Sequence, residues 1–526
     1  MPREREPLGR RSVRTFSVLT VGRVLSLLIG IATIIVIARL LGPDEYGVFT
    51  IAYAFFLLVS AASNFGFGQY LIKHLSEAED RHDRGAFSKS LGAAFVLVVA
   101  IGLALTALGI AISGPVAGLL NINGVNQQLL IIASSIVFFA MMYGSSDYAL
   151  VGVGKNAAAA ALEILENVVM LAVSAALVLM GYGAEGAAGG ILVSYLVAGA
   201  IGTYLIFRFA HRSMHVQVAM PKSGDLRKAL AFSLPVAGNN FLNNSMPSFG
   251  TLLLGFFVTA YELGNFGIAL RARTMLSIFY TTAAVSLIPT LTIATSRGTG
   301  NGGAKNIERV YNKSMAYSVL ASVPIIAYLG VYSTPLIYLF VSKSFSSAPL
   351  YLSLIALGTI IGVLGVYATS MFIAKAKTSK LIVYTGMCTV AQLISLALLV
   401  PAWGVLGAII SLFFVESIAC DYLFLRGTRT VLKLRTDYAM LARAFAANAA
   451  LAVLFSLGFY LSSMALQLIY GVAVMVIAYP FFLALFGALK TDDLEILRRA
   501  LEKLPAMRTV FEPMLSYLGF FIRHIQ

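Results

Sequence analysis

The fold of this chain is constrained most by its apolar stretches, which follow one another along almost the whole sequence. A helix that crosses a lipid bilayer needs about 20 predominantly apolar residues. Fourteen stretches are long enough, at residues 15–41, 46–72, 89–113, 127–153, 157–181, 186–209, 228–258, 263–295, 313–341, 347–374, 380–400, 404–425, 440–462 and 466–489. Soluble proteins carry about 25% charged residues, whereas the charged share of this chain is 12%. The sequence therefore predicts an all-α integral membrane protein with 14 transmembrane helices.

Two short motifs occur twice and show how these helices are grouped. The segment Glu45–Ala52 matches Glu262–Ala269 at Glu, Gly, Phe, Ile and Ala, 217 residues later. Gly183–Ala187 recurs as Gly404–Ala408, 221 residues later. Because the two offsets are nearly equal, they indicate two homologous halves, as in many transporters. We expect two pseudo-symmetric bundles of six helices, followed by two additional C-terminal helices.

The repeat and the polar connectors divide the chain into six parts. These are a basic cytoplasmic N-terminus (1–14), an N-terminal six-helix bundle (15–209), a cytoplasmic linker (210–227), a C-terminal six-helix bundle (228–425), helices 13 and 14 (440–489) and a cytoplasmic or interfacial tail (490–526). Inside the first bundle, Gly42-Pro43 should separate two helices, because proline lacks a backbone donor and fixes φ. In the tail, residues 491–504 combine a leucine face with a basic face, as amphipathic helices at a membrane surface do.

The positive charge of the chain is explained by topology. The formal net charge is +15, which in a soluble protein would suggest binding to nucleic acid. Lys and Arg are concentrated in alternate connectors and at both chain ends, whereas the opposite connectors contain only Lys343. Since loops rich in Lys and Arg stay in the cytoplasm, both termini should be cytoplasmic, and we expect a multi-pass protein of the cell membrane with no nucleic acid partner. The Arg-rich N-terminus precedes an apolar run too long for a signal peptide, so we expect an uncleaved first span.

Polar residues within the spans mark a candidate binding site. They are Arg23 on the first span, which belongs to a polar stripe, Asn240, Asn243 and Asn244 on the seventh, and Arg271 and Arg273 on the eighth. An arginine buried against lipid is costly, so such residues normally face a cavity or a charged partner. We therefore predict a positively charged central cavity for an anionic ligand, with these residues as its binding groups. The alternative is that the arginines pair with intramembrane acids for packing alone.

Intramembrane acids form a second group of candidates. Asp147, Glu163 and Glu166 lie in spans four and five, Glu416 lies in span twelve, and Asp421 lies near its inner edge. Glu163 and Glu166 are three residues apart and share a helix face. Acids in such positions often bind cations or relay protons, so Asp147, Glu163 and Glu166 are candidates for ion coupling. They can equally be static counter-ions of Arg23.

The sequence contains no recognisable catalytic motif. There is no nucleotide-binding loop, no zinc motif on a helix and no nucleophile elbow, so we expect a protein that is not an enzyme. The two cysteines, Cys388 and Cys420, lie in apolar segments and have neither disulfide nor metal spacing. We expect no metal site and no cofactor.

Several motifs carry a resemblance to a known family. The run Arg23–Leu41, the turn Leu40–Phe49 and the segment Asn64–Gly68 are similar to the polysaccharide or oligosaccharide flippases of the Wzx type. This family belongs to the superfamily that also holds the multidrug exporters and the lipid II flippases. The resemblance covers about residues 10–490. Two further combinations fit the same pattern, Lys155 with Gly186-Ala187 and Lys377 with Gly407-Ala408.

The resemblance implies two six-helix bundles around a central cavity that opens alternately to either side of the membrane. It implies a polyprenyl- or dolichyl-linked sugar pyrophosphate as the cargo. Lipid II flippases use cavity arginines on the first, second and eighth spans, and Arg23 matches the first position while Arg271 or Arg273 matches the eighth. The second span carries no arginine, which is a departure from that pattern.

We expect a flippase that moves a lipid-linked oligosaccharide from the cytoplasmic to the outer leaflet for glycan assembly. Its partners would be that lipid-linked oligosaccharide, membrane lipids, and glycosyltransferases or a polymerase of the same pathway. A cation-coupled drug exporter of the same superfamily is the alternative within transport. A membrane glycan polymerase or glycosyltransferase is the alternative among enzymes, although the short outer loops argue against it. A scaffold for envelope assembly would leave the polar stripes without an explanation.

Overall fold

The computed structural model describes residues 8–61, 67–120, 122–213, 220–274, 303–375, 377–489, 491, 493–495, 498 and 505–525. These residues form helices joined by short connectors, and no strand occurs among them. Nine helical segments of this described part are long and apolar enough to cross a membrane, by length and composition. The predicted fold class, an all-α integral membrane protein, is therefore confirmed. The described helices are also compatible with the predicted set of 14 spans.

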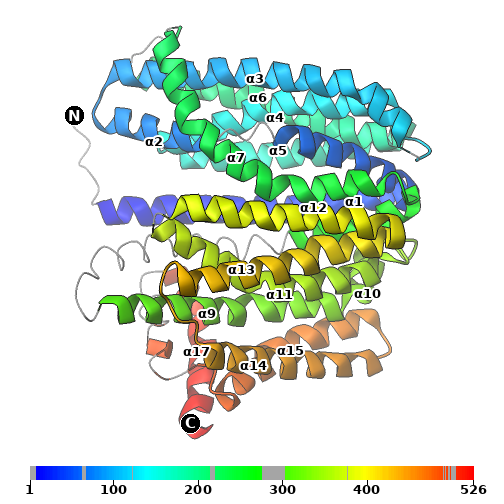
Figure 1. Cartoon of the computed structure of the whole chain (residues 1–526), viewed down its shortest axis with the longest axis vertical. Helices are drawn as coiled ribbons and strands as arrows, with labels where there is room; N and C mark the ends of the chain where they lie inside the picture. The colour runs from blue at the N-terminus through cyan, green and yellow to red at the C-terminus, as the bar shows by residue number, and fades with distance from the viewer. Residues whose placement is uncertain are drawn as a thin grey trace. The chain divides into compact units, whose positions relative to one another are not determined.

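The chain divides into two compact units, Met1–Gly267 and Ile268–Gln526. In the first unit, α5 packs along both α1 and α6, and α4 packs along α3 and α6. The elements of this unit, shown in Figure 1, are α1 (Leu8–Ala61), α2 (Phe67–Asp80), α3 (Arg84–Leu119), α4 (Gln127–Gly152), α5 (Asn156–Leu177), the π-helical turn η1 (Val178–Tyr182), α6 (Gly183–Ser213) and α7 (Ser223–Leu254), followed by the first residues of a helix over 260–274.

The break predicted at Gly42-Pro43 is confirmed inside α1. Gly42 has φ 71° and ψ 176°, a conformation outside the helical region that glycine adopts without strain. Pro43 then opens the next helical segment, where its missing donor is not needed. This segment ends at Ala61 and α2 begins at Phe67, so the predicted second span over 46–72 is divided between two helices.

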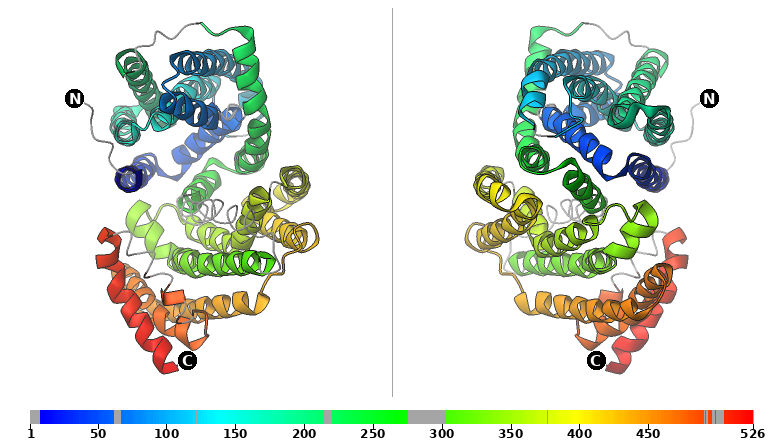
Figure 2. Two further views of the ribbon diagram at one scale, coloured as in Figure 1. Left: turned by 90° about the vertical axis from the view of Figure 1, so that its left-hand side faces the viewer. Right: turned by 90° about the vertical axis from the view of Figure 1, so that its right-hand side faces the viewer.

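The second unit contains the remaining helices. They are residues 268–274 of the helix named above, α9 (Gly303–Val331), α10 (Ser333–Leu336), η2 (Ile337–Val341), α11 (Ala348–Ala374), α12 (Thr378–Ile409), η3 (Ile410–Val415), α13 (Glu416–Thr430), α14 (Tyr438–Leu457), η4 (Gly458–Tyr460), α15 (Met464–Leu485) and α17 (Pro505–Ile525). The predicted eighth span, 263–295, lies largely outside the described residues. The sequence did not predict α17, which runs across α14 and α15 rather than along them (Figures 1 and 2).

The second repeated motif makes the same turn in both halves of the sequence. Gly183 has φ 49° and ψ −134°, and Gly404 has φ 54° and ψ −128°. Positive φ of this kind favours glycine. Each glycine reverses the chain inside an apolar stretch, so that Asn156–Arg212 and Ser379–Thr430 each contain two helices. The two pairs of backbone angles agree within about 6°, as expected for homologous halves.

The first repeated motif brings its two glycines together. Gly47 of α1 and Gly264 lie against each other within the first unit, at the same position of the repeat. A methyl group built on Gly47 would overlap the carbonyl oxygen of Ala260, and one built on Gly264 would overlap that of Pro43. Only glycine allows the two backbones to approach so closely. The sequence showed the repeat but gave no sign of this contact.

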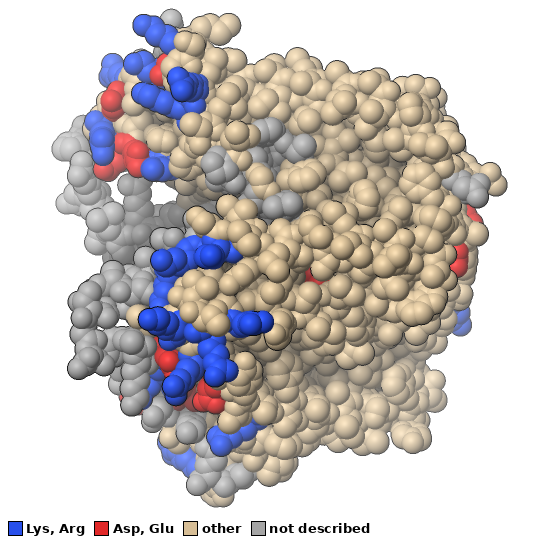
Figure 3. All heavy atoms as spheres, in the orientation of Figure 1, with Lys and Arg blue, Asp and Glu red and all other residues tan. Residues whose placement is uncertain are grey.

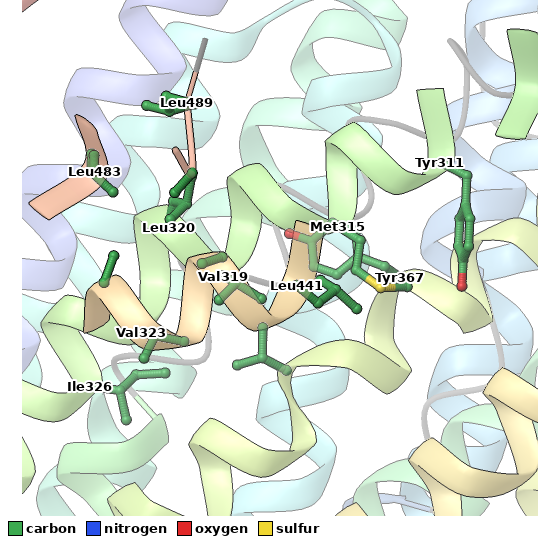
Figure 4. Packing of buried hydrophobic residues seen from close by; sticks show 14 of the residues in the cluster. Tyr311, Met315, Val319, Leu320, Val323, Ile326, Tyr367, Leu441, Leu483 and Leu489 are labelled. Atoms are coloured by element: carbon green, nitrogen blue, oxygen red, sulfur yellow. The ribbon is translucent and has the colours of Figure 1, made fainter. Parts of the chain in front are cut away.

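An aromatic-rich core holds α14 and α15 to the rest of the second unit. Figure 4 shows its residues from α9, including Met315 and Val319, packed against side chains of α11, α14 and the end of α15. Tyr332 donates a hydrogen bond to the carbonyl of Phe455 over 2.6 Å. Tyr479 donates to the carbonyl of Leu320 over 2.8 Å. The two C-terminal helices predicted over 440–462 and 466–489 correspond to α14 and α15, and both pack against the rest of this unit.

Charge is distributed unevenly along the helices. In each unit taken by itself, Lys and Arg gather at one end of the helices, whereas the visible sides are almost free of charge (Figure 3). A band free of charge is what the hydrocarbon of a bilayer requires. This agrees with the concentration of basic residues in alternate connectors, and the side of the membrane on which they lie stays a prediction.

Candidate substrate and ion sites

The polar stripe of the first span packs against α5 where it is described. A methyl group on Gly22 would touch Ala160, and one on Gly30 would lie 3.2 Å from the amide oxygen of Asn167. Ser26 and Thr33, on the same stripe, are buried. Position 23 therefore lies on a helical turn of α1 that is level with the start of α5, while the Arg23 side chain is outside the described part of the structure.

The three candidate ion-coupling acids all act electrostatically on one tyrosine of α4, Tyr143. The Tyr143 hydroxyl lies within electrostatic range of Asp147, Glu163 and Glu166. Asp147 and Glu163 are half-buried, and Glu166 is 6% exposed. The structure thus brings the three predicted acids into one neighbourhood, which we call the Tyr143 cluster.

Glu166 is held by neutral hydrogen-bond donors. The Asn167 amide donates to its Oε2 over 2.9 Å, and the Ser194 hydroxyl donates to its Oε1 over 3.4 Å. A buried carboxylate needs such donors or a cation, because removing it from water is costly. The sequence did not identify Tyr143 or Ser194, since single hydroxyls in apolar helices are common. Ion coupling by the Tyr143 cluster stays a prediction.

Arg273 has a defined acidic neighbour within the second unit. Its guanidinium lies 4.8 Å from the centre of the Phe413 ring, on η3. Glu416, the first residue of α13, lies within electrostatic range of Arg273 and accepts a hydrogen bond from the Gln392 amide. Nε of Arg273 is buried and makes no hydrogen bond among the described residues. Glu416 therefore acts on Arg273 electrostatically, and both the pairing with an intramembrane acid and the binding of an anionic ligand stay predictions.

For the other predicted site residues, the structure gives the helix on which each lies and, for two of them, the burial of the side chain. Arg271 is half-buried on the helix over 260–274, two residues before Arg273. Asp421 is buried on α13. Asn240, Asn243 and Asn244 belong to α7, and their side chains lie outside the described part of the structure. Binding of a substrate by any of these residues stays a prediction.

One ion pair unforeseen from the sequence joins the tail to the second unit. Lys313 of α9 pairs with Asp493, which also accepts a hydrogen bond from the Tyr317 hydroxyl over 2.6 Å. Asp493 is 2% exposed. The pair connects positions 180 residues apart, so spacing along the sequence gave no signal for it. It fixes the start of the tail to the basic end of α9.

The relationship of the chain to known proteins follows from its sequence and its fold. Residues 12–294 match the family described as polysaccharide biosynthesis protein. The chain belongs to the polysaccharide biosynthesis protein family. This match covers more than half of the chain and confirms the family resemblance found in its motifs. No curated protein matches this member of the family.

Solved structures share the fold of this family member. The lipid II flippase MurJ in its inward closed conformation aligns with a TM-score of 0.70 and 15% identity, over 89% of this chain and 98% of that one. An inward-facing multidrug resistance MATE family transporter of the MOP superfamily aligns with a TM-score of 0.65 and 16% identity, over 78% of this chain and 95% of that one. A MOP superfamily transporter from Pyrococcus furiosus aligns with a TM-score of 0.54 and 16% identity, over 82% of this chain and 98% of that one. Because the sequence identities are only 15–16%, these alignments show a shared fold and nothing more.

Proposed function

We propose that this protein moves a polyprenyl- or dolichyl-(pyro)phosphate-linked oligosaccharide from the cytoplasmic to the outer leaflet by alternating access. One observation carries the proposal: a chain of the polysaccharide biosynthesis protein family has the fold of a lipid II flippase along 89% of its length. Its arginines within the spans suit the phosphate groups of such a cargo, because guanidinium forms forked hydrogen bonds with phosphate. The protein would act as a transporter in the cell membrane, with enzymes of the same glycan pathway as its partners.

Arg23 and Arg271 or Arg273 are the proposed phosphate ligands, and Asn240, Asn243 and Asn244 the proposed neutral donors. The environment of Arg273 supports a particular mode of action. Since the guanidinium lies over the Phe413 ring and Glu416 acts on it electrostatically, a phosphate would compete with Glu416 for it. Competition of this kind weakens binding, and weak binding favours release of the cargo after it has crossed.

The second candidate function is cation-coupled export of a small molecule. The Tyr143 cluster favours it, because intramembrane acids close enough to influence one another can take up protons or cations. Coupling to an ion is also compatible with flipping, so the cargo distinguishes the two functions. A drug exporter would change the sensitivity of cells to toxic compounds and leave lipid-linked sugars unaffected.

Depletion of the protein tests the proposed function. In cells that lose it, lipid-linked oligosaccharide of full length should accumulate in the cytoplasmic leaflet, because synthesis continues while transfer stops. The measurement is the amount of extracted lipid-linked sugar, together with its protection from a glycan-cleaving enzyme added outside. Unchanged amounts and unchanged accessibility after depletion would exclude flipping. Accumulation of unpolymerised sugar in the outer leaflet would instead identify a polymerase.

The proposed orientation can be tested by labelling within the first unit. Asn123 is exposed in the connector before α4, and Ser223 is exposed at the start of α7. With Cys388 and Cys420 replaced by serine, Asn123→Cys should react with an impermeant reagent added outside intact cells, and Ser223→Cys should react only after permeabilisation. Asn123 is preferred to Gly124, whose φ of 93° would strain a cysteine. The opposite labelling pattern would reverse the orientation.

A further inference from the structure

The helix α17 is fastened to the second unit by one apolar face. Leu515, Leu518 and Ile522 follow a spacing of three and four residues and are buried. The ring of Phe521 packs edge-on against Phe481 of α15, with 5.5 Å between the ring centres. The helix α17 runs across α14 and α15 (Figures 1 and 2), as a helix parallel to the plane of a membrane crossed by those two helices would do.

A second face of α17 carries exposed aromatic side chains. Tyr517 is 39% exposed and Phe520 is 56% exposed. They lie three residues apart, close to Arg523 and His524 in the last turn. Aromatic rings next to basic residues are typical of helices that lie at the boundary between headgroups and acyl chains.

A cavity of about 490 Å³ lies between α17 and four described residues before it, Thr491, Leu494, Glu495 and Arg498. Arg498 borders it from the preceding segment, and Arg523 and His524 border it from α17, with Glu495 as the one acid among the lining residues. Arg498 is oriented by α17 itself, because it donates to the Ser516 hydroxyl over 3.3 Å and its Nε lies 3.2 Å from Oε1 of Glu512. Leu494 and Phe520 supply the apolar part of the lining.

We propose that this cavity binds the phosphate of an anionic phospholipid, with Arg498 and Arg523 as its ligands, and that α17 is an in-plane membrane anchor. Glu512 lies at Nε of Arg498 and Ser516 accepts from one of its terminal nitrogens, so other N–H groups of Arg498 and those of Arg523 can meet a phosphodiester. The apolar lining leads toward Phe520, where acyl chains would begin. The site lies at the last turn of α17, where the free carbonyl groups of the helix repel anions. Both arginines are therefore needed to offset this repulsion. The ion pair of Lys313 with Asp493 keeps this site at the basic end of the unit. The proposal is independent of whether the protein flips a lipid.

Binding of defined lipids to the full-length protein tests the site. In native mass spectrometry, the wild type should bind phosphatidylglycerol more tightly than phosphatidylcholine with the same acyl chains. Arg498→Gln/Arg523→Gln should weaken its tightest phosphatidylglycerol site by about 30-fold, since two cations near an anionic surface are lost. Arg426→Gln/Arg429→Gln removes two exposed arginines of α13 and is the matched control. Its affinity for phosphatidylglycerol should change by less than about twofold.

Two further measurements separate the lipid site from its alternatives. Arg498→Lys/Arg523→Lys keeps the charge and should recover most of the binding, whereas a loss equal to that of the glutamine variant would overturn a charge-based site. Inorganic phosphate at millimolar concentration should leave the bound lipid in place. Displacement by phosphate, equal binding of the two lipids, or equal weakening in the α13 control would each overturn the proposal.

The position of Phe520 gives an independent readout of the anchor. In Trp403→Phe/Phe520→Trp the new indole is the only one in the chain. Its fluorescence should be quenched by lipids brominated near the headgroup end of the acyl chain. An indole that is quenched by aqueous iodide and unaffected by brominated lipid would contradict the anchor.

Discussion

Replacing Arg273 by alanine is expected to slow flipping about tenfold or more, and the loss should persist when Glu416 is neutralised in the same protein. A charge-assisted hydrogen bond contributes roughly 1.5–3 kcal/mol, which corresponds to about 10- to 100-fold in a rate. The measurement is the amount of lipid-linked oligosaccharide that remains in the cytoplasmic leaflet, normalised to the amount of protein in the membrane. Arg23→Ala and Arg271→Ala are tested in the same assay.

The double variant Arg273→Ala/Glu416→Gln separates substrate binding from packing. Arg273→Ala alone leaves Glu416 without its positive neighbour, and an unpaired buried charge destabilises a protein by about 3–5 kcal/mol. If the double variant flips normally, Arg273 is a counter-ion and its proposed role as a phosphate ligand is wrong. Arg426→Ala, an exposed arginine on α13, should stay close to the wild-type rate. Normal flipping by all three single variants and by their combination would make these arginines structural.

Gly47→Ala and Gly264→Ala are each expected to destabilise the first unit by at least about 1–3 kcal/mol, the cost of overpacking a tight interior. Each new methyl group would overlap a backbone carbonyl oxygen, of Ala260 or of Pro43, and backbone atoms cannot rotate aside as side chains do. The expected result is a lower unfolding temperature and less folded protein after detergent extraction.

Gly144→Ala is the matched control for these glycine substitutions. Gly144 lies inside α4, and a methyl group there meets nothing within 4 Å. Alanine also favours a helix over glycine by roughly 0.5–1 kcal/mol, so this variant should be as stable as the wild type or slightly more stable. If Gly47→Ala behaves like Gly144→Ala, the close contact between Gly47 and Gly264 does not contribute to stability.

Much of the fold could be predicted because a membrane restricts what an apolar stretch can become. The length of each stretch defined most helices, and glycine with proline marked the break at Gly42. The repeated motif identified Gly183 and Gly404 as equivalent positions, which the structure shows at two matching turns. These signals are local, so they can be found without knowing which helices are neighbours. The family followed from the same local motifs and is confirmed by the match over residues 12–294.

The partners of the charged residues could not be predicted in the same way. In a membrane protein, apolar residues face lipid as well as other helices, so hydrophobic periodicity does not show which face of a span is buried. The neighbour of Arg273 is Glu416, far along the sequence, and Tyr143 joins its acids from two helices. The α17 helix was missed for a different reason: its apolar run, residues 514–522, is too short to span the membrane, and Pro513 lies inside the helix.

The contact between Gly47 and Gly264 bears on how such a chain could arise. The two residues occupy the same place in the repeat and touch each other, which is the geometry of a self-complementary interface between identical subunits. If the halves arose by duplication of a half-length protein, one substitution at this position would have appeared twice in the same contact of its dimer. Such a dimer could have formed this contact only with glycine at that position.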